Sequence, residues 1–170
     1  MFSVKIKLEK LRVLLLYALY LIVTLMLQSL LFSRLSFFGV RGFILPAAAV
    51  AAGMYLGGVR GAVFGLCLGV LSDLGFTEST VMYTLVFTCI GFAVGFMAEF
   101  YLNNSFPAYM LFSVLALLVT GAVQLLCAMI LHSAEFFPGL GAVLLQTVIS
   151  IPPVMLMYLP FRSLPSIGRR

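Results

Sequence analysis

The chain has 170 residues, of which 64% are hydrophobic and 9% are charged, and its formal net charge is +5. Soluble domains are about 45–50% apolar and about 25% charged, so this chain has too few polar residues to cover a water-facing surface. The composition excludes a soluble globular domain and predicts a single membrane domain over residues 1–170.

Six apolar stretches follow one another along the chain, separated by single charges and short polar turns. About 20 helical residues, each rising about 1.5 Å, cross a hydrocarbon core about 30 Å thick. The stretches are apolar on all sides, which argues against membrane strands and favours helices. The predicted fold is therefore an all-α integral membrane protein, a bundle of six transmembrane helices. These helices are expected at about 13–33, 42–58, 60–76, 80–99, 107–131 and 139–160.

Basic residues are distributed unevenly between the two sides of this predicted bundle. With the N-terminus in the cytoplasm, the basic tails 1–12 and 161–170 and Arg60 lie inside, and only Arg34 and Arg41 lie outside. Cytoplasmic segments normally carry such an excess of Lys and Arg. The sequence predicts a multi-pass protein with both termini in the cytoplasm. Topology and contact with anionic lipid explain the net positive charge, which is no evidence for nucleic acid.

Glycines recur every four residues along the third predicted helix, at Gly57, Gly61, Gly65 and Gly69, and the series ends at Asp73. Residues four apart share one helix face, so these glycines form a smooth groove that ends in a carboxylate. Small residues at this spacing let two helix backbones approach closely.

The fourth predicted helix repeats the pattern with Gly91, Gly95 and Glu99. The two grooves have two interpretations. They pack the third and fourth helices against their neighbours, or one of them docks the helix of a partner protein.

Asp73 adjoins the apolar core of the third predicted helix, and three roles are open for it. It caps a helix or orients a turn, it pairs with a base such as Arg34, Arg41 or a residue of a partner, or it carries a proton or contacts a substrate. A carboxylate in the membrane is costly, less so near the bilayer edge where this residue is expected.

Three glutamines, Gln28, Gln124 and Gln146, are predicted at a similar depth to Asp73. They either form one polar cluster with Asp73 that faces the bundle interior, or they make separate hydrogen bonds between helices. In the last helix, Pro152 and Pro153 each lack a backbone N–H, and a kink is expected there.

Motifs of catalytic chemistry are missing. The sequence has no phosphate-binding loop, no His/Cys set with metal-ligand spacing and no nucleophile beside a base. It predicts a non-enzymatic protein without a cofactor or a metal.

The segment Arg60–Asp73 reads R-G-x-x-x-G-x-x-x-G-x-x-x-D and resembles the rod shape-determining protein MreD family. The resemblance extends over nearly the whole chain, except that the family has one late proline where this chain has two. Further matches are Leu27–Gln28, Pro46, Tyr83, Gly91, Gly95 and either Pro152 or Pro153.

The resemblance implies a scaffold of the cell-elongation machinery in the bacterial inner membrane, which supports lateral peptidoglycan synthesis and cell shape. The implied partners are the single-span protein MreC, bound directly in the membrane, and MreB, RodA and its penicillin-binding transpeptidase. The matched positions are expected to serve packing or a partner interface, and the helix of MreC is expected to dock on the groove of the third or the fourth helix. These positions are Gln28, Arg60, Gly61, Gly65, Gly69 and Asp73.

The alternative function comes from another class of protein. Six short spans also resemble the substrate-capture subunits of energy-coupling-factor vitamin transporters, to which the MreD fold is similar. This function would need a ligand pocket beside Gln28, Asp73 and Gln146.

Overall fold

The computed structural model describes residues 17–30, 36–37, 40–75, 82–100, 105–132 and 136–163. The helices are Tyr17–Leu30, called the first helix below, and α2 (Leu45–Leu56), α3 (Gly58–Gly75), α4 (Met82–Phe100), α5 (Phe106–His132) and α6 (Phe136–Ser163). Two-residue strands, β1 (Ser36–Phe37) and β2 (Val40–Arg41), pair antiparallel. The prediction of an all-α membrane bundle is confirmed.

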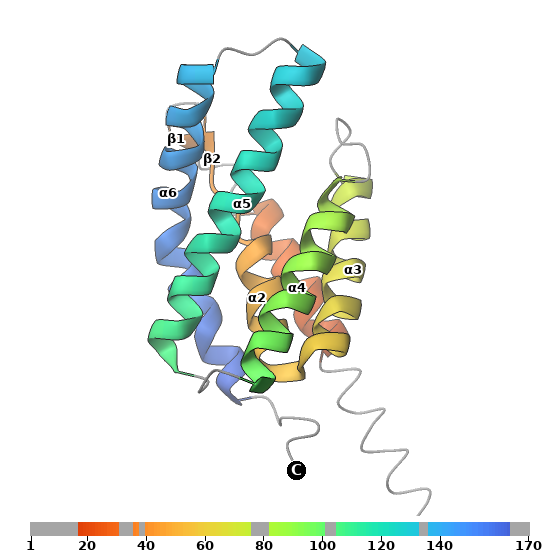
Figure 1. Cartoon of the computed structure of the whole chain (residues 1–170). Coiled ribbons are helices and arrows are strands. Elements are labelled where there is room, and N and C mark those ends of the chain that lie inside the picture. Colours follow the sequence, from red (N-terminus) through yellow and green to blue (C-terminus); the bar gives the residue numbers. More distant parts are fainter. Residues whose placement is uncertain are drawn as a thin grey trace, which may run out of the picture.

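Two helical hairpins, α3–α4 and α5–α6, lie on either side of α2 (Figure 1). Among the described residues, three helical spans are long and apolar enough to cross a membrane: Met82–Phe100, Phe106–Leu131 and Phe136–Met155. We call the end of the bundle that carries Arg60 and Glu99 the Arg60 end, and the opposite end, with Asp73, the Asp73 end.

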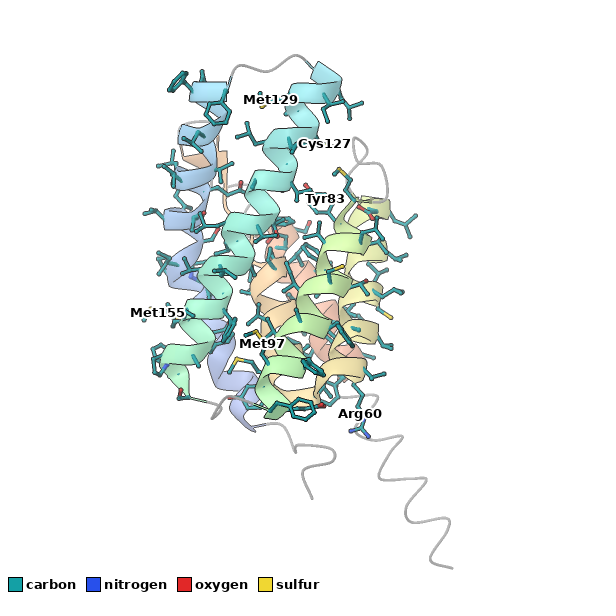
Figure 2. The ribbon with its side chains drawn as sticks, in the orientation of Figure 1. Arg60, Tyr83, Met97, Cys127, Met129 and Met155 are labelled. Carbon is teal, nitrogen blue, oxygen red and sulfur yellow. The ribbon has the colours of Figure 1, made fainter. Side chains whose placement is uncertain are left out.

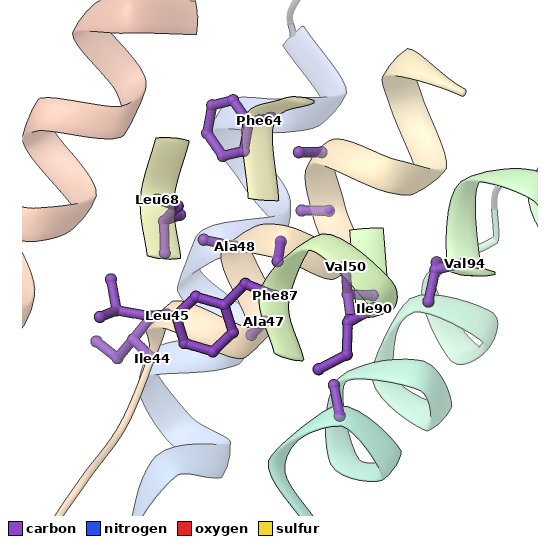
Figure 3. Packing of buried hydrophobic residues seen from close by; sticks show 14 of the residues in the cluster. Ile44, Leu45, Ala47, Ala48, Val50, Phe64, Leu68, Phe87, Ile90 and Val94 are labelled. Carbon is purple, nitrogen blue, oxygen red and sulfur yellow. The ribbon is translucent and has the colours of Figure 1, made fainter. Parts of the chain in front are cut away.

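The central helix α2 is apolar on all sides, as expected of a helix without a solvent-facing side. Its residues Leu45–Met54 are all buried, and it contacts α3, α4, α5 and α6. Five of these buried residues are alanines, whose small side chains let the neighbouring helices come close. Figure 3 shows Ala47, Ala48 and Val50 of α2 among larger side chains of α3 and α4.

The prediction that the second helix covers 42–58 is wrong at its start. α2 begins at Leu45, with Pro46 in its first turn, and it has 12 residues. At about 1.5 Å per residue it is about 18 Å long, too short to cross a hydrocarbon core about 30 Å thick. Residues 42–44 enter the bundle without helical structure.

The turn between α2 and α3 lies at Gly57, whose φ of 88° favours glycine. α3 therefore starts at Gly58, two residues earlier than predicted. At the other end of the chain, α6 continues through Pro152 and Pro153 as one helix to Ser163. The two prolines do not end the helix, and the kink expected there stays a prediction.

Candidate functional site

The glycines of α3 and α4 face each other across the two helices. A Cβ atom added at Gly61 would lie 2.6 Å from Cα of Gly53 in α2 and 2.7 Å from the carbonyl oxygen of Gly91 in α4. A Cβ at Gly95 would lie 2.6 Å from Cα of Gly58. Real Cβ atoms do not approach backbone so closely, so only glycine fits here. We call this contact the glycine seam; it comprises Gly53, Gly61, Gly65, Gly69, Gly91 and Gly95.

The seam confirms internal packing as the role of these glycines. The alternative, a partner's helix docked on the groove of α3 or α4, has no open groove in this structure. A Cβ at Gly65 would overlap the carbonyl of Phe87, and one at Gly69 would overlap the backbone of Thr84. Because the backbone of α4 fills the groove of α3, and that of α3 fills the groove of α4, neither groove is open to another helix.

Asp73 caps the first turn of α4. Its Oδ1 accepts the N–H of Tyr83 at 3.2 Å, and its Oδ2 accepts the N–H of Thr84 at 3.0 Å and the Thr84 hydroxyl at 2.5 Å. The first N–H groups of a helix have no partners within that helix, and a carboxylate both accepts them and complements the helix dipole. The capping role of Asp73 is confirmed; Arg34 and the side chain of Arg41 lie outside the described residues.

Glu99 makes the reciprocal contact at the Arg60 end. Its Oε1 accepts the N–H of Gly58, the first residue of α3, at 3.1 Å. Each glycine series thus ends in a carboxylate that caps the neighbouring antiparallel helix. The sequence showed Glu99 at the correct spacing, but its role as a cap for α3 required knowledge of which helices pair.

The cap at Asp73 leads to a prediction. We expect Asp73→Ala to lower the free energy of unfolding by about 1–2 kcal/mol, because it leaves helical N–H groups of α4 without their acceptor. Asp73→Asn keeps one acceptor oxygen and should lose less. Thermal unfolding of the purified variants in detergent measures both; equal losses for Ala and Asn would contradict the capping role.

Gln28 of the first helix holds the non-helical entry to α2. It is buried, its Nε2 donates to the carbonyl of Gly42 at 3.1 Å, and its Oε1 accepts the N–H of Ile44 at 2.8 Å. From the other side, Ser150 of α6 accepts the N–H of Phe43 at 2.8 Å and donates to the carbonyl of Gln146 at 2.7 Å. Lipid offers no hydrogen bonds, so side chains must satisfy this backbone. We call these contacts the entry clamp.

The entry clamp explains how a helix as short as α2 is tolerated in a membrane. Ser150 was not identified from the sequence. The one available signal was Pro46, since proline favours the first turn of a helix and therefore points to a start near Leu45.

Gln124 belongs to a second polar group. Its Nε2 donates to the Tyr83 hydroxyl at 2.9 Å, and Tyr83 directly follows the start of α4 that Asp73 caps. Figure 2 shows Tyr83 and Cys127 on facing parts of α4 and α5. The ring of Phe43 lies 5.4 Å from that of Tyr83, so it adjoins both polar groups.

One shared cluster of Gln28, Asp73, Gln124 and Gln146 was one of two interpretations of the sequence, and the structure divides these residues into two groups. Asp73 and Gln124 meet at the start of α4, and Gln28 and the backbone of Gln146 meet at the entry clamp. Separate hydrogen bonds between helices describe this arrangement better than a shared cluster.

Arg60 lies in the first turn of α3 with an exposed side chain that points away from the bundle (Figure 2). Its expected role at a partner interface stays a prediction. Among the residues that the structure describes, no group of three or more His, Cys, Asp or Glu side chains could hold a metal ion.

The sequence matches no protein-family model, and searches of curated proteins and of solved structures find no match. The resemblance to the MreD family and to transporter subunits is carried by the residues given above alone.

Proposed function

We propose that this protein is a non-enzymatic scaffold of the bacterial cell-elongation machinery, an MreD-like protein that binds a single-span partner of the MreC type. The observation that supports this proposal most is that the residues of the matched motif connect helices within the chain. Gly61, Gly65, Gly69 and Asp73 join α3 to α4, and Gln28 fixes the entry to α2. The residues of the resemblance pack and hydrogen-bond the helices together and hold no open site for chemistry, which fits a scaffold.

The same contacts weigh against the transporter alternative. A ligand beside Gln28 and Asp73 would need their polar atoms. Both amide atoms of Gln28 and both carboxylate oxygens of Asp73 already have partners within the chain. A ligand that replaced these partners would leave backbone groups that lipid cannot satisfy.

The partner's helix must bind elsewhere than on the glycine seam. Exposed apolar side chains on the outward faces of the helices, such as Ile22 and Met26 of the first helix, offer contact for a membrane helix. MreB, RodA and its transpeptidase would join directly or through this partner.

We further propose that the protein lies in the bacterial cytoplasmic membrane with the Arg60 end in the cytoplasm. An even number of helices puts both termini on one side, and that side carries eight of the ten Lys and Arg residues. Anionic head groups of the cytoplasmic leaflet would attract these side chains.

Co-purification tests the proposed function. The tagged chain, solubilised from its native membrane, should bring down a single-span protein with proteins of the elongation machinery, identified by mass spectrometry. Depletion of the chain should make rod-shaped cells round. A variant with an undisturbed bundle, Gly141→Ala, should still bring down the partner, because a Cβ at Gly141 meets nothing within 4 Å. Recovery of transport ATPases together with a bound vitamin would instead support the transporter alternative.

A further inference from the structure

The ends of the helices lie at different levels at the Asp73 end. The hydrogen bond from Gln124 to Tyr83 places Gln124 of α5 level with the second residue of α4. Contact of the Cys127 and Met82 sulfur atoms supports the same register, and α3 ends there too, since Asp73 caps α4. From Gln124, α5 continues to His132, which at about 1.5 Å per residue is about 12 Å further.

The other helix of this hairpin, α6, extends as far as α5 at the Asp73 end. Gly139 of α6 faces Leu125, and Val143 faces Gly121, so the start of α6 accompanies the end of α5. At the Arg60 end the hairpins finish at similar levels, whereas at the Asp73 end α5 and α6 rise beyond α3 and α4 (Figure 1). We call the part of this hairpin at 125–132 and 136–140 the tip.

The exposed side chains that the structure describes in the tip are apolar, and the one acidic or basic residue of its sequence is His132 at the end of α5. Ile130 is 72% exposed and Phe137 is 84% exposed. The chain carries no charged residue between Phe106 and Leu131, or between Phe136 and Phe161. Further exposed side chains of the tip are Leu126, Met129, Leu131, Phe136 and Leu140.

The molecule therefore has two hydrophobic lengths. On the α4 side, 19 residues give about 28 Å, close to an ordinary hydrocarbon core. On the α5 side, the apolar span Phe106–Leu131 has 26 residues and gives about 39 Å. Because α5 and α6 rise beyond α3 and α4 (Figure 1), a hydrocarbon core that ended level with the α4 side would leave the tip uncovered.

We infer that the tip is covered by lipid acyl chains, so that the leaflet at the Asp73 end is thicker beside α5 and α6 than beside α3 and α4. Acyl chains are fluid, and each ångström of mismatch costs little compared with exposing a large apolar side chain to water. The protein thus imposes a step in bilayer thickness around itself, independently of which partner it binds.

Cysteine accessibility in proteoliposomes tests this inference, since there only lipid can cover the tip. The variants Ile130→Cys and Phe137→Cys are made in a chain whose Cys67, Cys89 and Cys127 are replaced by alanine. The purified full chain is reconstituted in phosphatidylcholine with 14-, 18- or 22-carbon chains, and a membrane-impermeant maleimide is added to both sides. Thr77→Cys, next to Glu78 in the turn that the sequence predicts to lie outside the membrane, sets the reference rate for a thiol in water. Leu85→Cys, 66% exposed on α4 near this end, sets the rate within the shared lipid belt.

In 18- and 22-carbon lipid we expect both tip cysteines to react at least tenfold more slowly than Thr77→Cys, as Leu85→Cys does. In 14-carbon lipid the tip should become reactive while Leu85→Cys stays protected. Tip cysteines as reactive as Thr77→Cys in 18-carbon lipid would overturn the inference. If the same cysteines were then protected in native membranes, a protein and not lipid would be the occupant of the tip.

Discussion

The variant Gly61→Ala should lose roughly 3 kcal/mol of unfolding free energy, at the upper end of the range for an overpacked core. The added methyl would lie 2.6 Å from Cα of Gly53 and 2.7 Å from the oxygen of Gly91, both backbone atoms that cannot rotate away. α3 must then move from α2 and α4 together. The equilibrium between folded and unfolded protein in mixed detergent micelles measures the loss.

Gly141→Ala is the matched control for this experiment. Gly141 is also a helical glycine, on α6, and a Cβ there meets nothing within 4 Å. Alanine favours helix over glycine by about 1 kcal/mol, so this variant should be unchanged or slightly more stable. If the two substitutions had equal effects, the glycine seam would not be the close contact described above.

The variant Gln28→Leu should lose about 2–6 kcal/mol of unfolding free energy. Leucine keeps much of the side-chain volume but leaves the carbonyl of Gly42 and the N–H of Ile44 without the amide that they bond. Each buried backbone group without a partner costs about 1–3 kcal/mol. The same detergent equilibrium measures this loss.

Gln124→Leu is the comparison for Gln28. It removes one hydrogen bond, to a half-buried tyrosine hydroxyl, and hydrogen bonds between membrane helices average about 0.6 kcal/mol. It should therefore cost less than about 1 kcal/mol. A loss at Gln124 as large as that at Gln28 would mean that the entry clamp has no special role.

The sequence predicted the number and order of the helices because lipid leaves the chain few alternatives. Long stretches without charge must form helices, and their limits follow from Arg60, Asp73 and Glu99, which the structure places within three residues of the ends of α3 or α4. Spacing of glycines by four also predicted close backbone contact correctly.

Spacing could not show which backbone lies against which groove. A smooth helix face fits a helix of the same chain as well as one from a partner, and the choice depends on tertiary packing. The role of Glu99 as a cap for Gly58 has the same origin, since 41 residues separate the two along the chain.

The start of α2 was mispredicted because residues 42–44 are as apolar as the helix that follows. Apolar composition predicts burial, but it does not reveal that the side chains of Gln28 and Ser150, from two other helices, satisfy this backbone. Only such partners make a non-helical segment tolerable within a membrane.

The glycines and polar side chains of the matched motif hold this bundle together, so a partner of the kind proposed above would bind its outward faces. An electron cryomicroscopy map of the complex purified from native membranes in lipid nanodiscs tests it most directly. We expect the backbone of α4 against Gly61, Gly65 and Gly69, and the Gln28 amide on Gly42 and Ile44. A partner's helix between α3 and α4, or a small molecule bonded to Gln28 or Asp73, would contradict the account.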